Sequence, residues 1–432
     1  MEHIAKNVPQ VSSVSRGDTV TEMALDAEND KYRSLIFGVL EQLDSACLEI
    51  VEGSHRRCFG NPDALLRGEI IVHDSSFYRQ ATHNGSIGAA EAYIEGKWSS
   101  PHLTHVIQIM ARHQTQLDQL DSNVRWLNTA KNWLLRKRNA NNESGSKRNI
   151  LAHYDLGNEL YTRFLDNSMQ YSSAIYSRDA TDLTLAQQNK MRTICERLEL
   201  TSTDKVIEIG TGWGGQAIFM AQNYGCHVTT TTISDAQHEY AQSKVKELGL
   251  GENITLLKQD YRQLTGQYDK LVSIEMIEAV GHEYLPTFFD TCSRLLKDDG
   301  KMLIQSITIA DGRYEKYRKG VDFIQKYIFP GGCLPSIAVI SNNIANHTDM
   351  VVHQINDIGL HYARTLQDWR TTFEKNWESI RPHGYDEPFR RLWLFYFCYC
   401  EGAFIERVIS THHIVARKPR YRGQQDETVL DY

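Results

Sequence analysis

One segment constrains the fold of this chain more than any other: a glycine-rich turn that lies between an apolar strand and a helical stretch. The turn VIEIGTGWGG covers Val206 to Gly215, and helical sequence follows from Gln216 to Tyr224. Glycines in such a turn let backbone N–H groups approach a ligand closely. The pattern therefore predicts a strand, a ligand-binding turn and a helix in succession.

Further apolar strands alternate with helical stretches after this turn, which predicts a parallel α/β sheet. A last apolar strand follows a helical insert and is expected to complete the sheet. The predicted strands are Lys205 to Ile209, Cys226 to Ile233, Ile254 to Lys258, Lys270 to Ile274, Lys301 to Ile309 and, after the insert, His413 to Ala416.

The position of an acid relative to the glycines separates the candidate nucleotide ligands. Glu208 precedes Gly210 by two residues, as in the ExGxGxG pattern of class I methyltransferases. A dinucleotide-binding fold carries its acid about 20 residues beyond the glycines. The next strand ends in Thr231 to Ser234, with no carboxylate for a ribose. We therefore expect an α/β fold of the Rossmann-like class I type, with S-adenosylmethionine as its cofactor.

Polar side chains after the second and third strands complete the expected cofactor site. The hydroxyl groups of Thr232 and Ser234 and the amide of Gln237 can contact a nucleoside, and Asp260 in QDYR can accept a hydrogen bond from the adenine amine. The cofactor residues predicted from these patterns are Glu208, Gly210, Gly212, Gly214, Thr232, Ser234, Gln237 and Asp260.

The bulk composition is that of a globular protein and excludes several partners. The 432 residues exceed one typical domain. Lys and Arg total 47 against 54 Asp and Glu, and the net charge of −7 gives no global attraction to nucleic acid. The eight cysteines include no CxxC pair, which indicates a reducing cytoplasm and argues against a metal site. With no apolar signal segment and no run of ~20 apolar residues, we expect a soluble, cytoplasmic protein.

Shifts in composition divide the chain into regions. We expect a loose arm at 1–30, a smaller helix-rich N-terminal domain at 31–130, a basic linker at 131–149, a catalytic domain at 150–420 with an insert at 310–410, and a tail at 421–432. The linker KNWLLRKRNANNESGSKR could touch phospholipid headgroups. It could equally be a solvated helix end whose apolar residues dock inward.

Several motifs occur in order between about Glu69 and Lys418: GSIGAAEAYIEGKW, AHYDLGNELYTRFLD, MQYSSAIY, VIEIGTGWGG, TTISDAQ, QDYR, IEMIEAVG, KYIFPGGCLPS and CEGAF. Through them the chain resembles the cyclopropane-fatty-acyl-phospholipid synthase family, which includes the mycolic acid cyclopropane synthases. The resemblance implies that Tyr154, Tyr171 and Ser172 join the cofactor site and that the N-terminal domain docks on a membrane. Packing between domains is the structural alternative for each of these three residues.

The family's reaction, as the resemblance implies it, adds a methylene group from S-adenosylmethionine to the cis double bond of an unsaturated phospholipid acyl chain. Attack by weak π electrons leaves a carbocation, so the pocket must be dry, aromatic and supplied with a base. Two stretches of the insert offer candidate aromatic side chains, most of which we expect to be core: Tyr327, Phe329, Trp393, Phe395, Tyr396 and Tyr399.

In the family, bicarbonate held by Cys, Glu, His and Tyr side chains takes the proton that allows the ring to close. Here Glu278 and Tyr396 match, and Ile307 keeps a position that contributes backbone. The cysteine position is Ser173 and the histidine position is Gln305. Serine and glutamine can still donate hydrogen bonds to bicarbonate, which stays open as a second cofactor.

Without bicarbonate, a desolvated Glu278 could remove a proton directly and leave a methylated or methylene-bearing chain. Glu278 could also be a structural acid that caps a helix. Glu275, three residues earlier, could be an acid on the cofactor side rather than the base.

Other classes of protein stay open at this point. A methyltransferase of soluble small molecules would share the cofactor turn, but the aromatic insert of roughly a hundred residues is long enough to wall an acyl tunnel. A lipid-binding protein without activity would not need three glycines in the turn. A homodimer would add avidity for a membrane.

Overall fold

The structure is a computed structural model that describes residues 27–114, 141, 145, 149 and 157–423. The predicted arm at 1–30 and tail at 421–432 lie mostly outside the described residues, and so does most of the basic linker at 131–149. Tyr154 also lies outside them. The contacts group the chain into two compact units, which we call the seven-stranded unit and the four-stranded unit.

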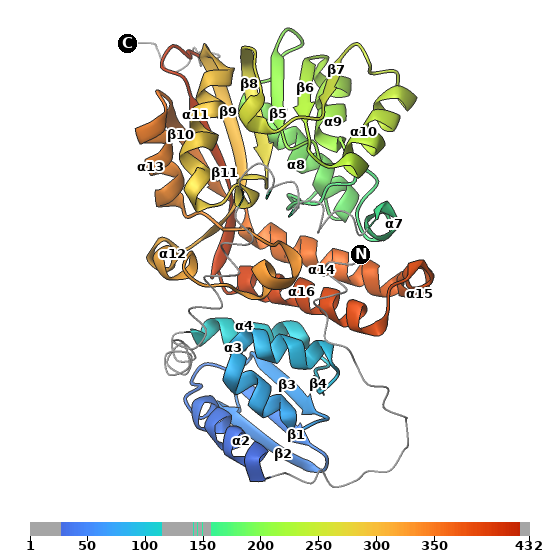
Figure 1. The fold of residues 1–432 in the computed structure, drawn as a ribbon, viewed down its shortest axis with the longest axis vertical. Coiled ribbons are helices and arrows are strands. Elements are labelled where there is room, and N and C mark those ends of the chain that lie inside the picture. The colour runs from blue at the N-terminus through green and yellow to red at the C-terminus, as the bar shows by residue number, and fades with distance from the viewer. Residues whose placement is uncertain (1–26, 115–140, 142–144, 146–148, 150–156, 424–432) are drawn as a thin grey trace. The chain divides into compact units, whose positions relative to one another are not determined.

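The seven-stranded unit comprises Asn139–Lys319, Gly331–Thr365 and Ile409–Tyr432. Its sheet has the order β10-β11-β9-β8-β5-β6-β7 (Figure 1). Neighbouring strands from β7 to β9 are parallel, whereas β11 runs antiparallel to both β9 and β10. The predicted α/β fold is confirmed, with one antiparallel strand in a sheet that the sequence pattern described as parallel.

The strands of this sheet are β5 (Lys205–Ile209), β6 (His227–Thr231), β7 (Ile254–Leu257), β8 (Tyr268–Ile274), β9 (Leu296–Ile309), β10 (Val351–Asp357) and β11 (Ile409–Arg417). Its helices are α7 (Asn158–Tyr161), α8 (Leu183–Leu198), α9 (Gly215–Tyr224), α10 (Asp235–Glu247), α11 (Leu285–Leu295), α12 (Asp311–Tyr317) and α13 (Ile337–His347). The six predicted strands are all present. Strand β10 was not predicted, because its largely exposed edge position needs no apolar run.

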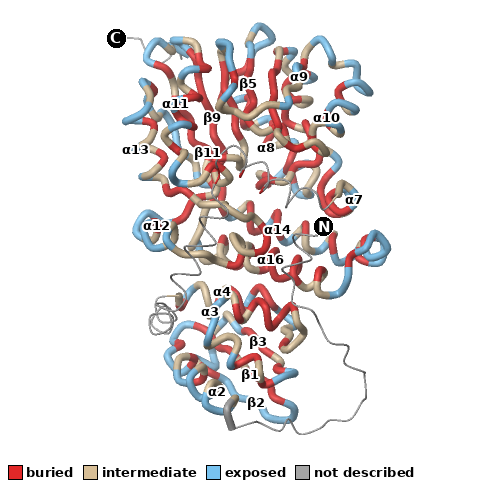
Figure 2. Tube along the Cα trace, viewed as in Figure 1, coloured by how far each residue is buried: buried red, intermediate tan, exposed pale blue. Residues whose placement is uncertain are grey.

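Successive residues of the central strands enter two different cores, which explains why these strands read as continuous apolar runs. Ile207 of β5 packs on the face covered by α11 and α13. Its neighbour Val206 packs on the face covered by α8 and α9. Figure 2 shows the resulting burial along β5 and β9. A sheet buried on both faces leaves the ends of its strands as the place for a polar site.

The four-stranded unit comprises Met1–Arg138, Gly320–Pro330 and Leu366–Val408. Its sheet has the order β2-β1-β3-β4, in which β1 is antiparallel to β2 and parallel to β3. The strands are β1 (Cys47–Glu52), β2 (His55–Gly60), β3 (Arg67–Val72) and β4 (Trp98–Ser99). The helices are α2 (Ala27–Leu40), α3 (Ser76–Ile94), α4 (Leu103–Arg112), α15 (Trp377–Ile380), α16 (Glu387–Ile405) and the C-terminal part of α14 (Gly359–Lys375).

Most of the predicted insert belongs by contact to this unit rather than to the seven-stranded unit. Helix α16 contains the apolar run Leu392 to Cys400, most of which is buried. It packs on α3 and α4, and a Cβ added at Gly402 would lie only 2.7 Å from the Ile107 side chain of α4. Tertiary packing therefore joins part of the predicted insert at 310–410 to the predicted N-terminal domain at 31–130. The predicted boundaries of the functional domains stay a prediction.

Candidate active site

The glycine turn lies between the end of β5 and the start of α9. Gly210, Gly212 and Gly214 have φ values of 103°, 54° and 91°, which side-chain-bearing residues rarely adopt. A Cβ added at Gly212 would meet nothing within 4 Å, so this part of the backbone can be approached by a ligand. At Gly215 a Cβ would lie 2.3 Å from the Ser168 carbonyl oxygen. That close approach requires glycine at Gly215, a role that the glycine pattern alone did not assign.

Glu208 is buried beneath this turn and is held by the protein itself. Its Oε2 accepts a hydrogen bond from Thr230 Oγ1 at 2.6 Å, and the Thr230 and Thr211 hydroxyl groups are 2.7 Å apart. Burial raises the pKa of Glu208 to about 8, while Thr230 and Lys190 oppose the rise. Glu208 thus supports the turn from within, and its predicted contact with the cofactor stays a prediction.

The predicted polar residues on α10 form the helix N-cap. Ser234 Oγ accepts a hydrogen bond from the Gln237 N–H at 3.3 Å, and Thr232 Oγ1 donates to Gln237 Oε1 at 3.0 Å. Asp260 is held at both carboxylate oxygens by the Arg262 guanidinium, at 2.8 Å each. These residues follow the ends of β6 and β7, so they share the strand-end edge with the glycine turn. Their contacts with a nucleoside stay predictions.

Ser172 lies on the same side of the unit, next to a lysine that the sequence pattern did not single out. Lys190 of α8 is fully buried and donates hydrogen bonds to Ser172 Oγ, at 3.0 Å, and to Gln170 Oε1. Burial lowers the pKa of Lys190 to about 8. The ring of Tyr171 packs against Tyr161 with centroids 5.3 Å apart. An amphipathic helix pattern gives no signal for a buried lysine, so only packing reveals Lys190.

Two glutamates follow the end of β8. Glu275 accepts hydrogen bonds from Ser173 N at 2.9 Å, Gln305 Nε2 at 2.7 Å and Tyr362 Oη at 2.7 Å. Glu278 Oε1 accepts a hydrogen bond from the Ile307 N–H. The segment that carries both glutamates passes the glycine turn, since a Cβ added at Gly210 would be 3.3 Å from the side chain of Met276.

Burial raises the pKa of Glu278 to about 8, and the neighbouring Glu275 adds to the rise. Burial also raises the pKa of Glu275, although its hydrogen-bond donors oppose this. Glu278 Oε2 is buried and has no hydrogen-bond partner among the residues that the structure describes. The structure therefore brings together four of the five predicted catalytic residues: Ser173, Glu278, Gln305 and Ile307.

Tyr396, the fifth predicted catalytic residue, belongs to the four-stranded unit. It is buried on α16, where its ring packs against Trp393 at a centroid distance of 5.6 Å and against Phe329 at 6.4 Å. Phe395 and Tyr399 stack nearby, with centroids 6.1 Å apart. Tyr327, Trp393, Phe395 and Tyr396 are buried in the core, as expected for most of the set, whereas Phe329 and Tyr399 are partly exposed. A catalytic role for Tyr396 stays a prediction.

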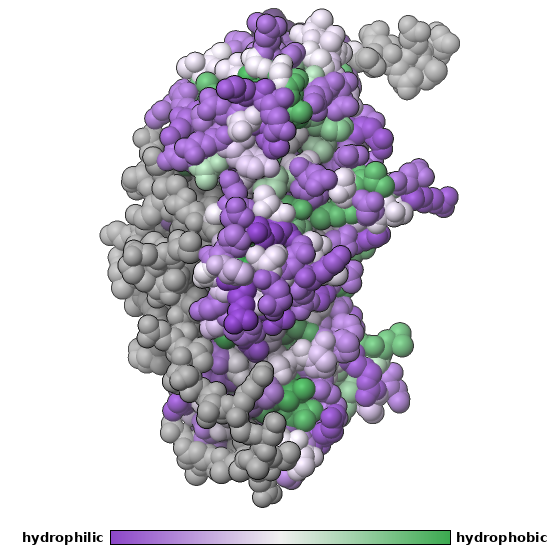
Figure 3. Space-filling model, turned by 90° about the vertical axis from the view of Figure 1, so that its right-hand side faces the viewer, coloured by the Kyte–Doolittle hydropathy of each residue, from purple (hydrophilic) through white to green (hydrophobic). Residues whose placement is uncertain are grey.

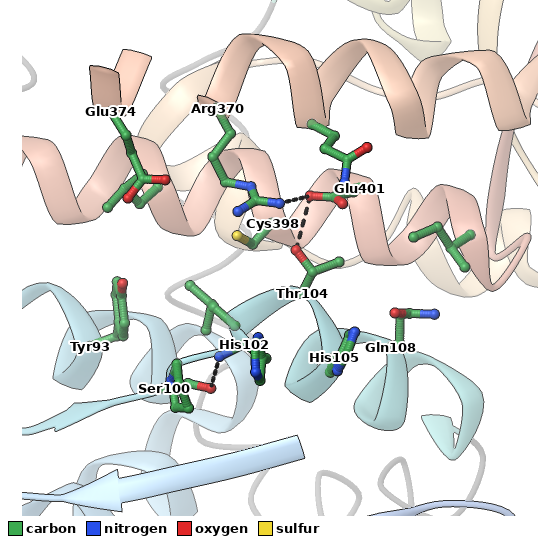
Figure 4. Close-up of a pocket in the computed structure, with 15 residues that line it drawn as sticks. Tyr93, Ser100, His102, Thr104, His105, Gln108, Arg370, Glu374, Cys398 and Glu401 are labelled. Carbon is green, nitrogen blue, oxygen red and sulfur yellow. Dashed lines mark hydrogen bonds and ion pairs between the residues drawn. The ribbon is translucent and has the colours of Figure 1, made fainter. Parts of the chain in front are cut away.

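The four-stranded unit also contains a polar cavity of about 450 Å³ (Figure 4). It lies between α4 on one side and α14 and α16 on the other. Glu401 Oε2 accepts hydrogen bonds there from Thr104 Oγ1 at 2.9 Å and from Arg370 Nη2 at 3.1 Å. None of the predicted cofactor or catalytic residues lines this cavity.

The sheet order, the glycine turn after β5 and the polar strand ends define the class of this protein: a class I S-adenosylmethionine-dependent methyltransferase. Solved structures agree. The cyclopropane synthase MmaA2 from Mycobacterium tuberculosis has a TM-score of 0.59 at 25% identity, over 63% of this chain and 98% of that one. The mycolic acid cyclopropane synthase CmaA1, solved with SAH and CTAB, has a TM-score of 0.58 at 28% identity and the same coverage.

Sequence comparisons give the family. Residues 141–414 match the model of the mycolic acid cyclopropane synthetase family. The cyclopropane-fatty-acyl-phospholipid synthase of Escherichia coli is 36% identical over 350 residues, which are 80% of this chain and 87% of that protein. The tuberculostearic acid methyltransferase of Mycobacterium tuberculosis is 35% identical over 352 residues, 80% of this chain and 82% of that protein. The chain belongs to the mycolic acid cyclopropane synthetase family, and the predicted resemblance is confirmed.

Proposed function

We propose that this protein transfers the methyl carbon of S-adenosylmethionine to the cis double bond of an unsaturated phospholipid acyl chain and closes a cyclopropane ring. The observation that carries the proposal is a pair of partly buried glutamates with raised pKa values, Glu275 and Glu278, on the segment that passes the glycine turn of a chain in this family. A proton must leave the methylated chain before a ring can form, and a buried carboxylate can accept it.

The chain's own residues divide the work. The turn from Gly210 to Gly214 and the start of α10 would hold the cofactor, which when bound supplies an electrophilic methyl carbon. The open space at Gly212 fits a ligand that approaches the backbone. The acyl site would also have to keep water from the carbocation, which water would otherwise trap.

The proposed acceptor requires contact with a membrane. No helix among the described residues is long and apolar enough to cross one. On the face shown in Figure 3, hydrophobic side chains of the described residues form small separate groups among hydrophilic ones. The basic linker at 131–149, which lies mostly outside the described residues, is our candidate for peripheral binding to anionic headgroups on the cytoplasmic leaflet. We also propose a homodimer, because two linkers would bind a surface more tightly than one.

The test is to incubate the purified protein with methyl-labelled S-adenosylmethionine and vesicles of unsaturated phospholipid, and to analyse the acyl chains by mass spectrometry and NMR. We expect a labelled cyclopropane in the unsaturated vesicles and no label in matched vesicles of saturated phospholipid. A labelled, methylated alkene would mean that the cation loses a different proton. Absence of label from both vesicles would contradict a lipid acceptor.

A further inference from the structure

The carboxylate of Glu275 accepts hydrogen bonds from three donors that come from different parts of the chain. Ser173 precedes α8, Gln305 lies on β9, and Tyr362 lies in the first turn of α14. Ser173 and Gln305 are two of the five positions that the family resemblance assigns to a bound bicarbonate, and the two at which the residue type differs from the family. In the structure both donate to a carboxylate that belongs to the protein.

The orientation of the Gln305 amide is determined by a histidine behind it. His413 of β11 is fully buried, and burial together with Arg197 lowers its pKa well below the usual value, so the ring is neutral. Arg197 contacts His413 Nδ1, and Nε2 therefore carries the proton and donates to Gln305 Oε1 at 2.8 Å. The amide NH₂ group of Gln305 must then face Glu275.

The remaining donors at this point are also used. Gln305 Nε2 lies 2.7 Å from Glu275 Oε1 and 3.4 Å from the Ser173 carbonyl oxygen, and Ser173 Oγ donates to the Ala174 carbonyl oxygen at 3.0 Å. An external anion could take these hydrogen bonds only by displacing Glu275 or Ala174. The donor set is already matched by an internal carboxylate.

The backbone at Glu275 supports a functional role. Its φ of 47° lies in the left-handed region, which favours glycine. A side chain there costs on the order of 1–3 kcal/mol, and such strain is concentrated at functional sites. Three hydrogen bonds hold the carboxylate in place despite that strain.

The neighbouring Glu278 indicates which of the two acids is charged. Two close, partly buried carboxylates do not both ionise easily, so one keeps a proton. Glu275 has three hydrogen-bond donors and the nearby charge of Lys190 to stabilise its carboxylate, whereas Glu278 has the Ile307 N–H at one oxygen, the side chain of Ser306 nearby and a pKa of about 8. Glu275 therefore holds the negative charge at neutral pH, and Glu278 is protonated.

We infer that Glu275 is the base of ring closure and that this protein needs no bicarbonate. The inference rests on the proposed function. After the π electrons of the double bond have formed a bond to the methyl carbon and the S–C bond has broken toward sulfur, the acyl chain carries a cation. The Glu275 carboxylate accepts a proton from the added carbon, and the electron pair of that C–H bond forms the bond that closes the ring. Glu275 then releases the proton to solvent.

The experiment measures turnover of the wild type and of Glu275→Gly with unsaturated vesicles, in buffer stripped of carbon dioxide, before and after addition of bicarbonate or formate. We chose glycine because it relaxes the backbone at the φ of 47°. We expect wild-type turnover to be unchanged by bicarbonate. We expect Glu275→Gly to lose about 10²–10⁴-fold in turnover, the usual contribution of a general base. Bicarbonate or formate should partly restore it by filling the vacated space.

Two readouts separate this inference from a structural role. Calorimetry should show that Glu275→Gly still binds S-adenosylmethionine. In infrared difference spectra at neutral pH, Glu278→Gln should lose a protonated carboxyl band that Glu275→Gln keeps. Wild-type turnover that depends on bicarbonate, or a variant that small anions do not rescue although it binds the cofactor, would overturn the inference. An inactive wild type would instead contradict the proposed function.

Discussion

Two regions of the molecule each enclose a glutamate, Glu401 buried and Glu275 partly buried, and they stabilise its charge differently. In the four-stranded unit, Glu401 is 4% exposed and forms an ion pair with Arg370 at 3.1 Å. In the seven-stranded unit, Glu275 is held by three neutral donors and lies beside a second acid, with no ion pair to a cation among the described residues. A guanidinium satisfies a carboxylate and leaves it inert, whereas neutral donors hold the charge in place but leave it able to accept a proton.

The largest effect that would test this contrast is the pH dependence of stability. The folded-state pKa of Glu278 is raised from 4.5 to about 8, so the folded protein binds this proton more tightly than the unfolded chain does. The free energy of unfolding should fall as pH rises between those two values, by on the order of 3–5 kcal/mol. Thermal unfolding across this pH range should show a shallower decline for Glu278→Gln than for the wild type. Equal slopes would contradict the protonated state of Glu278.

A smaller effect is expected in the other region. Glu401→Ala leaves Arg370 and Thr104 without their carboxylate, and we expect a loss of about 2 kcal/mol in the free energy of unfolding. The expected loss in the free energy of unfolding is small because Arg370 is 25% exposed and water can solvate its unpaired guanidinium. Chemical denaturation measures it. The matched control is Glu374→Ala, at a more exposed position beside the same cavity, which should change stability by less than about 0.5 kcal/mol. If Glu401→Ala stays fully folded but loses turnover, Glu401 is not merely structural, and the difference between the two glutamates is contradicted.

The smallest effect concerns the histidine behind Gln305. His413→Phe removes the donor that orients the amide, and loss of one hydrogen bond should lower kcat about tenfold. KM for the phospholipid should change little, because His413 acts through Gln305 rather than on the acyl chain. The control is His412→Phe, the next residue of β11, whose Nδ1 contacts Thr308 instead. An equal fall in kcat for both variants would show a general effect of strand packing.

The sequence by itself determined the local parts of this protein. The strand, turn and helix around Gly210 are adjacent in the chain, and alternating apolar runs predicted six of the seven strands of the larger sheet. The family motifs identified Ser173, Glu278, Gln305 and Ile307, which the fold brings together. These features depend on residue type and short spacing, which sequence displays directly.

Only the tertiary structure decided which hydrogen-bond partners these residues have, and with them the pKa values of the two glutamates. The sequence left bicarbonate or Glu278 as the base and Glu275 as a candidate acid on the cofactor side, and it gave no role to Tyr362, Lys190 or His413. Tyr362 and His413 reach their partners because α14 and β11 pack against segments 87 and 108 residues away in the chain. The charge of a buried acid depends on its neighbours in space, and the order of residues along a chain does not specify those neighbours.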